Sequence, residues 1–267
     1  GPMAGATFTV SNTCERELIN SQGTEVILDE TVTIQGGQTV TLPNVLPIGA
    51  TCYAAETNSV GAGTVTISHP QGSPVQITDQ TPDVSISVDN NYATGGVVLN
   101  KVITGAAASY AQGPFVFSTV CTLGGYTLPT VTSTLTPTSL TSTLTGLPVG
   151  AVCVVTEINN GGASTPTVPV VVGTVTVPAQ GAPAVSVTAT NDFPTGSLSV
   201  TKTLSGSGSA VMAGATYTMQ VTCERDLIGG GTEVIVNSTV PVVAGQTVTP
   251  PAVPPMGARW WHREQPG

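Results

Sequence analysis

The stretch VVLNKVI at residues 97–103 recurs as LSVTKTL at residues 198–204, and these two copies contain the only lysines of the chain, Lys101 and Lys202. Successive side chains of a β-strand point to opposite faces, so each lysine shares a face with the Leu, Val or Ile residues at alternate positions. A charged amine that points into an apolar core is costly unless it is paired or chemically changed. The stretch therefore predicts a buried strand whose lysine has a chemical role.

The repeat extends over the whole chain with a period close to that of a complete domain, which fits an array of independent domains rather than a solenoid. The motif LPIGATC at residues 46–52, for example, recurs as LPVGAVC at residues 147–153. We expect three domains: residues 1–94, without the lysine-bearing first strand; residues 95–194, the complete copy; and residues 195–267, which stop before the last strand.

Thr, Ser, Val, Gly and Pro dominate the composition, and short runs of alternating apolar and polar residues are separated by Gly and Pro. This pattern is typical of β-strands joined by turns. Several short antiparallel strands in each copy predict an all-β fold of tandem immunoglobulin-like β-sandwiches with Greek-key connections. Residues 127–145 are rich in Thr, Ser and Pro, as O-glycosylated segments are, but their alternating Leu and Val favour ordinary strands. The short joints at residues 92–95 and 193–196 predict domains that lie end to end with limited freedom.

Composition and motifs exclude several classes of function. Charged residues make up 8% of the chain and the net charge is −9, whereas nucleic-acid binding needs clustered Lys and Arg. No apolar run is long enough to span a membrane. His69 and His262 are isolated and no Cys-x-x-Cys spacing occurs, so we expect no metal site, no cofactor and no Ser-His-Asp set. Gly1-Pro2 is typical of the remainder left by a protease, so native targeting signals would lie outside this sequence.

The middle copy contains three charged residues, Lys101, Glu157 and Asp192. Lys101 and Glu157 lie on the apolar faces of their predicted strands, and Asn191 ends the last strand on such a face. A spontaneous isopeptide bond needs these three groups: a neutral amine attacks a carboxamide carbon, a protonated Glu shuttles protons, and ammonia leaves. Burial favours the neutral forms of both Lys and Glu. The other interpretation is a buried Lys101–Glu157 ion pair with Asn191 capping a strand end, which would add little stability.

The order of these elements resembles the Cna-B-type repeat domains of Gram-positive, in particular actinobacterial, cell-surface adhesins and pili. The elements are the lysine in the first strand, LPVGA at residues 147–151, the Glu of a mid-domain strand and the closing VTATND at residues 187–192. The resemblance covers the full middle copy and most of the other two. It implies a reverse-immunoglobulin sandwich in which Lys101 is the nucleophile, Asn191 the acceptor and Glu157 the proton shuttle.

The other two copies hold incomplete equivalents of this set. The first has Glu56 and Asn90 in matching places but no lysine, and the third has Lys202 and Glu264 but nothing that matches the Asn. We expect sequence outside this chain to complete each of them in an intact protein. Another interpretation is that the Lys202 strand of one molecule fills the gap in the first domain of another, giving a strand-exchange oligomer. The tail at residues 259–267 departs from the repeat, which favours a truncated or out-of-frame end over a divergent one.

The cysteines occupy equivalent inward positions in the copies and are expected to pair within each copy, as in a variant of the family from actinobacterial surface proteins. The expected pairs are Cys14 with Cys52 and Cys121 with Cys153. Cys223 is left over, because Trp260 stands where its partner would be. Disulfides at matching positions fit an oxidising, extracellular setting. The alternative is a set of buried free thiols.

The sequence thus predicts the structural stalk of a bacterial cell-surface adhesin or pilus-like protein, extracellular and anchored to the cell wall in its parent protein. It predicts no enzyme beyond a single-turnover reaction of the chain on itself, with neighbouring repeats of the same protein as its partners. Two alternatives remain: a module that binds a host protein or glycan directly, and an accessory domain of a secreted enzyme. Aromatic residues are only 4% of the chain, with Tyr53 and Tyr110 as the outward candidates for direct binding.

Overall fold

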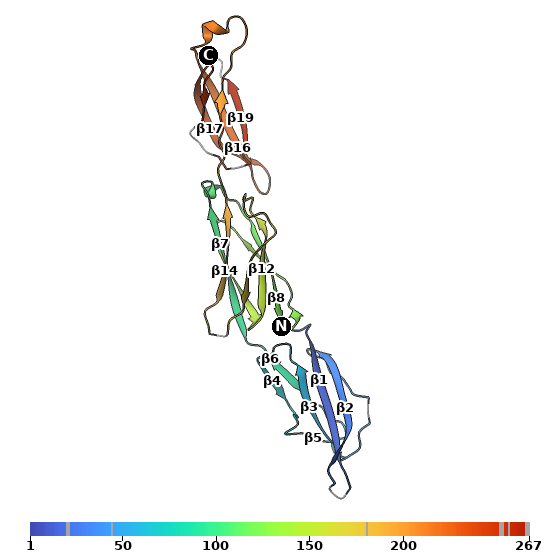
Figure 1. Cartoon of the computed structure of the whole chain (residues 1–267). Helices are drawn as coiled ribbons and strands as arrows, with labels where there is room; N and C mark the ends of the chain where they lie inside the picture. The colour runs from blue at the N-terminus through green and yellow to red at the C-terminus, as the bar shows by residue number, and fades with distance from the viewer. Residues whose placement is uncertain (20–21, 44, 180, 251–253, 256, 265–267) are drawn as a thin grey trace.

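The computed structural model describes residues 1–267 except 20–21, 44, 180, 251–253, 256 and 265–267. Three β units follow one another along an elongated molecule, with the amino-terminus near the junction of the first two units (Figure 1). Strands make up the regular structure of the described residues apart from two short 3-10 helices, η1 (Ala108–Tyr110) and η2 (Ser209–Met212). The predicted all-β fold is confirmed. No helix in the part of the chain described is long and apolar enough to cross a membrane.

The middle unit is a sandwich of two sheets. Its strands are β7 (Thr94–Thr104), β8 (Phe115–Leu123), β9 (Tyr126–Thr127), β10 (Val131–Leu135), β11 (Thr141–Pro148), β12 (Val152–Asn160), β13 (Val170–Thr176) and β14 (Val185–Asp192). One sheet has the order β10-β8-β12-β13, with β9 beside β8, and the other has the order β11-β7-β14. The first strand, β7, and the last strand, β14, are parallel neighbours. Leu99, Phe115, Phe117, Val155 and Val187 are among the buried residues between the sheets.

The first unit has one full sheet and a reduced second one. Its strands are β1 (Thr7–Glu17), β2 (Thr24–Gln35), β3 (Thr51–Asn58), β4 (Thr64–Ile67), β5 (Val75–Gln76) and β6 (Val88–Asn91). The full sheet has the order β2-β1-β3-β5, and the second consists of β4 and β6. Two segments of the first unit form no strand, residues 45–47 and residues 84–87. Their counterparts in the middle unit belong to β11 and β14. In the middle unit β11 and β14 both bond to β7, and no described strand takes the place of β7 in the first unit. Ser87 bonds to Ser68 instead.

The third unit contains β15 (Val200–Thr201), β16 (Thr216–Asp226), β17 (Thr232–Val243), β18 (Thr247–Val248) and β19 (Arg259–Glu264). The strand order is β17-β16-β19, with β15 and β18 forming a separate pair. Most of the divergent tail therefore forms a strand, and Trp260 lies opposite Cys223 in the register of β16 and β19. Residues 265–267 of that tail lie outside the described residues. Val200, Met219, Val221, Val240 and Val242 form the buried core.

Specific contacts hold the joint between the middle and third units. The guanidinium of Arg225 donates to the carbonyl of Tyr110 and lies 5.1 Å from the centre of the Tyr110 ring. The Gln112 side chain donates to the Asp226 carbonyl at 3.1 Å and accepts from the Ile228 amide at 2.8 Å. These contacts restrict bending at the joint. They also bring Tyr110, which is half-buried, into contact with the third unit.

Candidate functional site

Lys101, Glu157 and Asn191 meet in the core of the middle unit. The Lys101 Nζ donates to Glu157 Oε1 at 2.8 Å, and the Asn191 Nδ2 donates to the same oxygen at 2.9 Å. The side chains of Lys101 and Glu157 are fully buried, and so is Asn191. One carboxylate oxygen thus holds the amine and the amide that the sequence predicts to react.

The strand pairing explains why these three side chains converge. In the parallel register of β7 and β14, Lys101 lies opposite Ala189, and Asn191 follows two residues later on the same face. A diagonal neighbour at this offset is within reach of a long side chain. Glu157 comes from β12 in the facing sheet, beside Phe117 of β8, and completes the cluster across the core.

The surroundings of the amine are apolar. The Lys101 Nζ lies 4.9 Å from the centre of the Phe115 ring and 5.9 Å from that of Phe117. Burial lowers the pKa of Lys101, and the hydrogen bond and charge of Glu157 act in the opposite direction. The net direction is downward, so the site favours the neutral, nucleophilic form of the amine more than water does.

Two buried oxygen atoms of the cluster have no hydrogen-bond partner, Glu157 Oε2 and Asn191 Oδ1. Unpaired buried polar atoms are uncommon, and each costs roughly 1–3 kcal/mol. The cluster therefore has two buried acceptors that its hydrogen bonds leave unsatisfied.

The other two units contain parts of the same cluster. In the first unit, Asn90 Nδ2 donates to Glu56 Oε1 at 2.7 Å, and Glu56 Oε2 and Asn90 Oδ1 are again buried without partners. In the third unit, Lys202 Nζ lies 2.8 Å from Glu264 Oε2 and 4.8 Å from the centre of the Tyr217 ring. The first unit thus has the Glu–Asn half of the site, and the third has a Lys–Glu pair.

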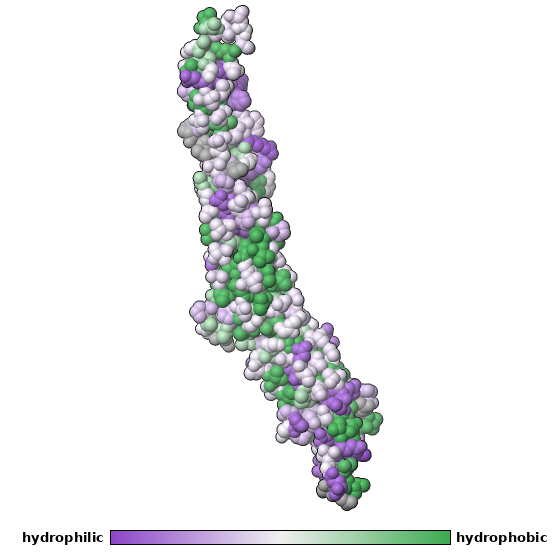
Figure 2. Space-filling model, in the orientation of Figure 1, coloured by the Kyte–Doolittle hydropathy of each residue, from purple (hydrophilic) through white to green (hydrophobic). Residues whose placement is uncertain are grey.

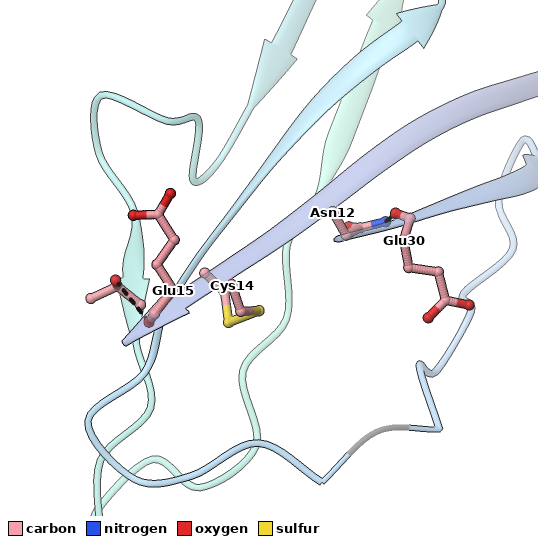
Figure 3. Close-up of a disulfide and its surroundings, with 6 residues drawn as sticks. Asn12, Cys14, Glu15 and Glu30 are labelled. Atoms are coloured by element: carbon pink, nitrogen blue, oxygen red, sulfur yellow. Dashed lines mark hydrogen bonds between the residues drawn. A yellow bond between two sulfur atoms is a disulfide. The ribbon is translucent and has the colours of Figure 1, made fainter. Parts of the chain in front are cut away.

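Both predicted disulfides are present, each between directly opposed residues of adjacent strands. Cys14 on β1 bonds to Cys52 on β3, and Cys121 on β8 bonds to Cys153 on β12. Figure 3 shows Cys14 on β1 with Asn12 and Glu30 nearby, where the Asn12 Nδ2 donates to the Glu30 carbonyl at 3.5 Å. The buried Cys223 is the free cysteine, and burial raises the pKa of its thiol. Among the described residues, no group of three His, Cys, Asp or Glu side chains could hold a metal ion.

Thiol titration of the denatured, unreduced chain is expected to give one thiol, from Cys223, and to give five after reduction. Replacing Cys121 and Cys153 by Ser should lower the free energy of unfolding of the middle unit by about 3–4 kcal/mol, because the bond closes a loop of some thirty residues. Cys223→Ala is the matched control: it should remove the titratable thiol and leave both disulfides. Five thiols before reduction would contradict the pairing.

Comparisons with known proteins give one family match. A family model described as "Domain of unknown function (DUF5979)" matches residues 1–93, 97–194 and 198–267. A sequence comparison with curated proteins found no match.

Solved structures similar to this chain include three surface proteins. Two B repeat units of the collagen-binding protein of Staphylococcus aureus are 12% identical with a TM-score of 0.28; the match covers 99% of this chain and 65% of that one. A Mobiluncus mulieris adhesin with disulfide, isopeptide and ester cross-links is 14% identical, with a TM-score of 0.31 and coverages of 70% and 84%. The major pilin of Streptococcus pyogenes is 12% identical, with a TM-score of 0.33 and coverages of 72% and 92%. Cna B repeats, the domains that the sequence resembles, are thus among these structures.

Proposed function

We propose that this chain, which belongs to the family described as "Domain of unknown function (DUF5979)", has a load-bearing structural role. It would form part of the stalk of a bacterial cell-surface protein. In this proposal the middle unit is locked by an intramolecular isopeptide bond between Lys101 and Asn191, with Glu157 as the proton shuttle. The observation that supports it is the fully buried Lys–Glu–Asn cluster between the first and last strands. A simple ion pair would leave two buried oxygen atoms unsatisfied at this place.

The reaction needs no reagent beyond the chain itself. The lone pair of the neutral Lys101 Nζ attacks the Asn191 Cγ, and a new carbon–nitrogen bond forms as the bond from Cγ to Nδ2 breaks. One amine proton passes through Glu157 to the leaving nitrogen, which departs as ammonia. The products are a secondary amide and ammonia, and no atom changes oxidation state.

The geometry favours this reaction in three ways. The amine and the amide share one carboxylate oxygen, so they are held together without an entropic cost at the moment of reaction. The apolar surroundings favour the neutral amine. The Glu157 carboxyl group contacts both the attacking and the leaving nitrogen, as a proton shuttle must.

A bond between β7 and β14 would suit a stalk. The units follow one another in an elongated molecule, so tension enters the middle unit at β7 and leaves it at β14 (Figure 1). A covalent link between these adjacent strands would carry that tension past the rest of the unit. The two disulfides add constraints on the unfolded chain and fit an oxidising environment outside the cell.

The intact mass of the chain tests the proposal. It should lie about 17 Da below the sequence mass, in addition to the loss of hydrogens from two disulfides, because one ammonia leaves. Digestion should yield a peptide in which Lys101 is joined to Asn191. Lys101→Ala should abolish the deficit, while Lys202→Ala, the change at the equivalent position of the third unit, should retain it. An unshifted mass in the unaltered chain would support the ion-pair interpretation instead.

Direct binding to a host protein or glycan is the second candidate, and an exposed apolar strip on the middle unit favours it. Val152 and Val154 of β12 and Val171 of β13 are 37–59% exposed. Hydrophobic residues gather on the middle part of the surface in Figure 2, and such patches often mark contact sites. Binding to an array of matrix proteins and glycans that is lost when these three valines become Thr would support this candidate, and no binding would count against it.

A further inference from the structure

The Asn191 amide makes a second hydrogen bond, to the main chain of β12. Its Nδ2 donates to Glu157 Oε1 at 2.9 Å and to the carbonyl oxygen of Asn160 at 3.0 Å. The amide oxygen, Asn191 Oδ1, is buried without a hydrogen-bond partner. Both described partners of the amide thus lie on its nitrogen, which is the atom that leaves in the proposed reaction.

A main-chain carbonyl fixes the orientation of an amide more firmly than a carboxyl group does, because a carbonyl can only accept a hydrogen bond. A carboxyl group that carries a proton can also donate, so Glu157 by itself would fit either orientation of the amide while it moves a proton. The reversed amide would place Asn191 Oδ1 against the Asn160 carbonyl, with no proton between two acceptors. The carbonyl therefore holds the leaving nitrogen beside Glu157.

An irregularity in β12 brings this carbonyl to the cluster. Glu157 lies opposite Phe117 of β8 and Asn160 lies opposite Phe115, with a register shift between Glu157 and Asn159. Residues three apart on a regular strand point to opposite faces. Here both lie opposite buried phenylalanines of one face. A bulge of this kind redirects the strand that contains it, and such bulges are common beside active sites.

The Asn160 side chain fixes the turn that follows. Its Nδ2 donates to the carbonyls of Ala163 and Pro166, at 3.0 and 2.8 Å. Its Oδ1 accepts from the Gly162 amide at 3.1 Å. These three hydrogen bonds hold the end of β12 in place, so the Asn160 carbonyl is oriented before any reaction begins.

The equivalent carbonyl of the first unit has a different partner. Ser59 stands at the position of Asn160, and Tyr92 at the position of Phe193. The Tyr92 hydroxyl donates to the Ser59 carbonyl at 2.6 Å. Phe193 is buried in the core of the middle unit and has no hydroxyl to donate. Residue 193 therefore decides whether a hydroxyl can compete with the Asn191 amide for this carbonyl.

We propose that the main-chain carbonyl of Asn160 is a further catalytic group, which orients the Asn191 amide and stabilises its leaving nitrogen. The proposal rests on the proposed function, since it concerns the same bond. The Lys101 Nζ bonds to Asn191 Cγ, and Glu157 passes the amine proton to Nδ2. This nitrogen then carries a positive charge until its bond to Cγ breaks and ammonia leaves.

The charge on the leaving nitrogen makes the carbonyl effective. Hydrogen bonds from a charged donor are roughly twice as strong as those from a neutral donor. The carbonyl therefore stabilises the transition state more than the unreacted amide, which is the condition for catalysis. The Asn160 side chain acts through this carbonyl and is a positioning group.

The rate of ammonia loss during folding tests the proposal. A chain recovered unfolded from inclusion bodies starts to react when it folds on dilution, and its intact mass follows the loss of about 17 Da with time. Phe193→Tyr should slow this loss roughly tenfold or more, because its hydroxyl takes the carbonyl as that of Tyr92 does. Asn160→Ala should also slow it, because the turn no longer holds the carbonyl. Ser59→Ala, the matched control in the first unit, should keep the rate.

Phe193→Leu separates catalysis from packing. It removes a ring from the core but adds no donor, so it should react at nearly the unaltered rate. A purely structural role of residue 193 predicts the reverse order, with Leu slower than Tyr. Each change is also made in Lys101→Ala, where the midpoint of thermal unfolding reports stability without the bond. The slow reaction of Phe193→Tyr should come without a fall in that midpoint.

The results also separate this proposal from the proposed function. A Phe193→Tyr chain that reacts at the unaltered rate, or a Phe193→Leu chain slower than it, overturns the role of the carbonyl and leaves the isopeptide bond intact. A matching fall in the midpoint of Phe193→Tyr overturns that role as well. An unaltered chain that keeps its full mass overturns both proposals.

Discussion

The Glu157→Ala variant is expected to retain its full sequence mass, about 17 Da above the value that loss of ammonia would give. Among the described residues, Glu157 is the group that hydrogen-bonds to both the Lys101 amine and the Asn191 amide. Without it, no described group is hydrogen-bonded to both nitrogens to move the proton, and the reaction stops before the bond forms. Glu157→Gln keeps the shape of the side chain and should also fail, since an amide cannot act as the proton shuttle.

The loss of the bond should also lower the stability of the middle unit. A link between Lys101 and Asn191 closes a loop of about 90 residues, for which loop-closure entropy gives on the order of 4–5 kcal/mol. For a domain of this size the midpoint of thermal unfolding should fall by roughly 20 °C or more. Glu157→Gln is the better variant for this measurement, because Glu157→Ala also leaves a cavity and an unpaired buried amine.

Glu56→Ala provides the matched control, because Glu56 holds the equivalent place beside Asn90 in a unit without the lysine. It should leave both the mass deficit and the unfolding midpoint of the middle unit unchanged. A Glu157→Gln chain that still loses ammonia would show that the proton takes another route and would remove Glu157 from the mechanism.

Strand alternation and the internal repeat were enough to predict the three members of the cluster. Alternation places Lys101, Glu157 and Asn191 on inward faces, and the order of the strands brings those faces together. The shared carboxylate oxygen could not be predicted, because it depends on the register of β7 with β14 and on the approach of β12 from the other sheet. Such contacts are set by tertiary packing rather than by local pattern.

The first unit contains a segment whose local sequence pattern predicts a strand that does not form. Residues 84–87 alternate as residues 185–188 do, yet the former are not paired as a strand. The difference lies in the neighbour: β14 bonds to β7, and the first unit has no such strand among its described residues. A strand needs a hydrogen-bonding partner as well as a suitable sequence. The contact of Arg225 with Tyr110 at the second joint was likewise not predictable, because it joins residues of two units.

Pulling the chain from its two ends should distinguish the crosslinked middle unit from every variant that lacks the bond. In the intact chain, force passes from Lys101 to Asn191 through the isopeptide bond, and the residues between them remain folded or slack. In Lys101→Ala, about 90 residues can extend once the unit unfolds. While the Cys121–Cys153 disulfide is intact, the 32 residues that it closes cannot extend. At roughly 3.4 Å per residue, this variant should lengthen by about 200 Å when oxidised and about 300 Å when reduced.

The two disulfides give this experiment an internal control. Cys121 and Cys153 lie between the crosslinked residues, so reduction should add no length to the middle unit of the intact chain. The Cys14–Cys52 bond closes a separation of 38 residues in the first unit, which has no lysine to protect it. Its reduction should therefore add roughly 130 Å in the intact chain and in Lys101→Ala alike. Lys202→Ala should behave as the intact chain does. A middle unit that extends by about 200 Å in the intact, oxidised chain would mean that its first and last strands are held by hydrogen bonds alone.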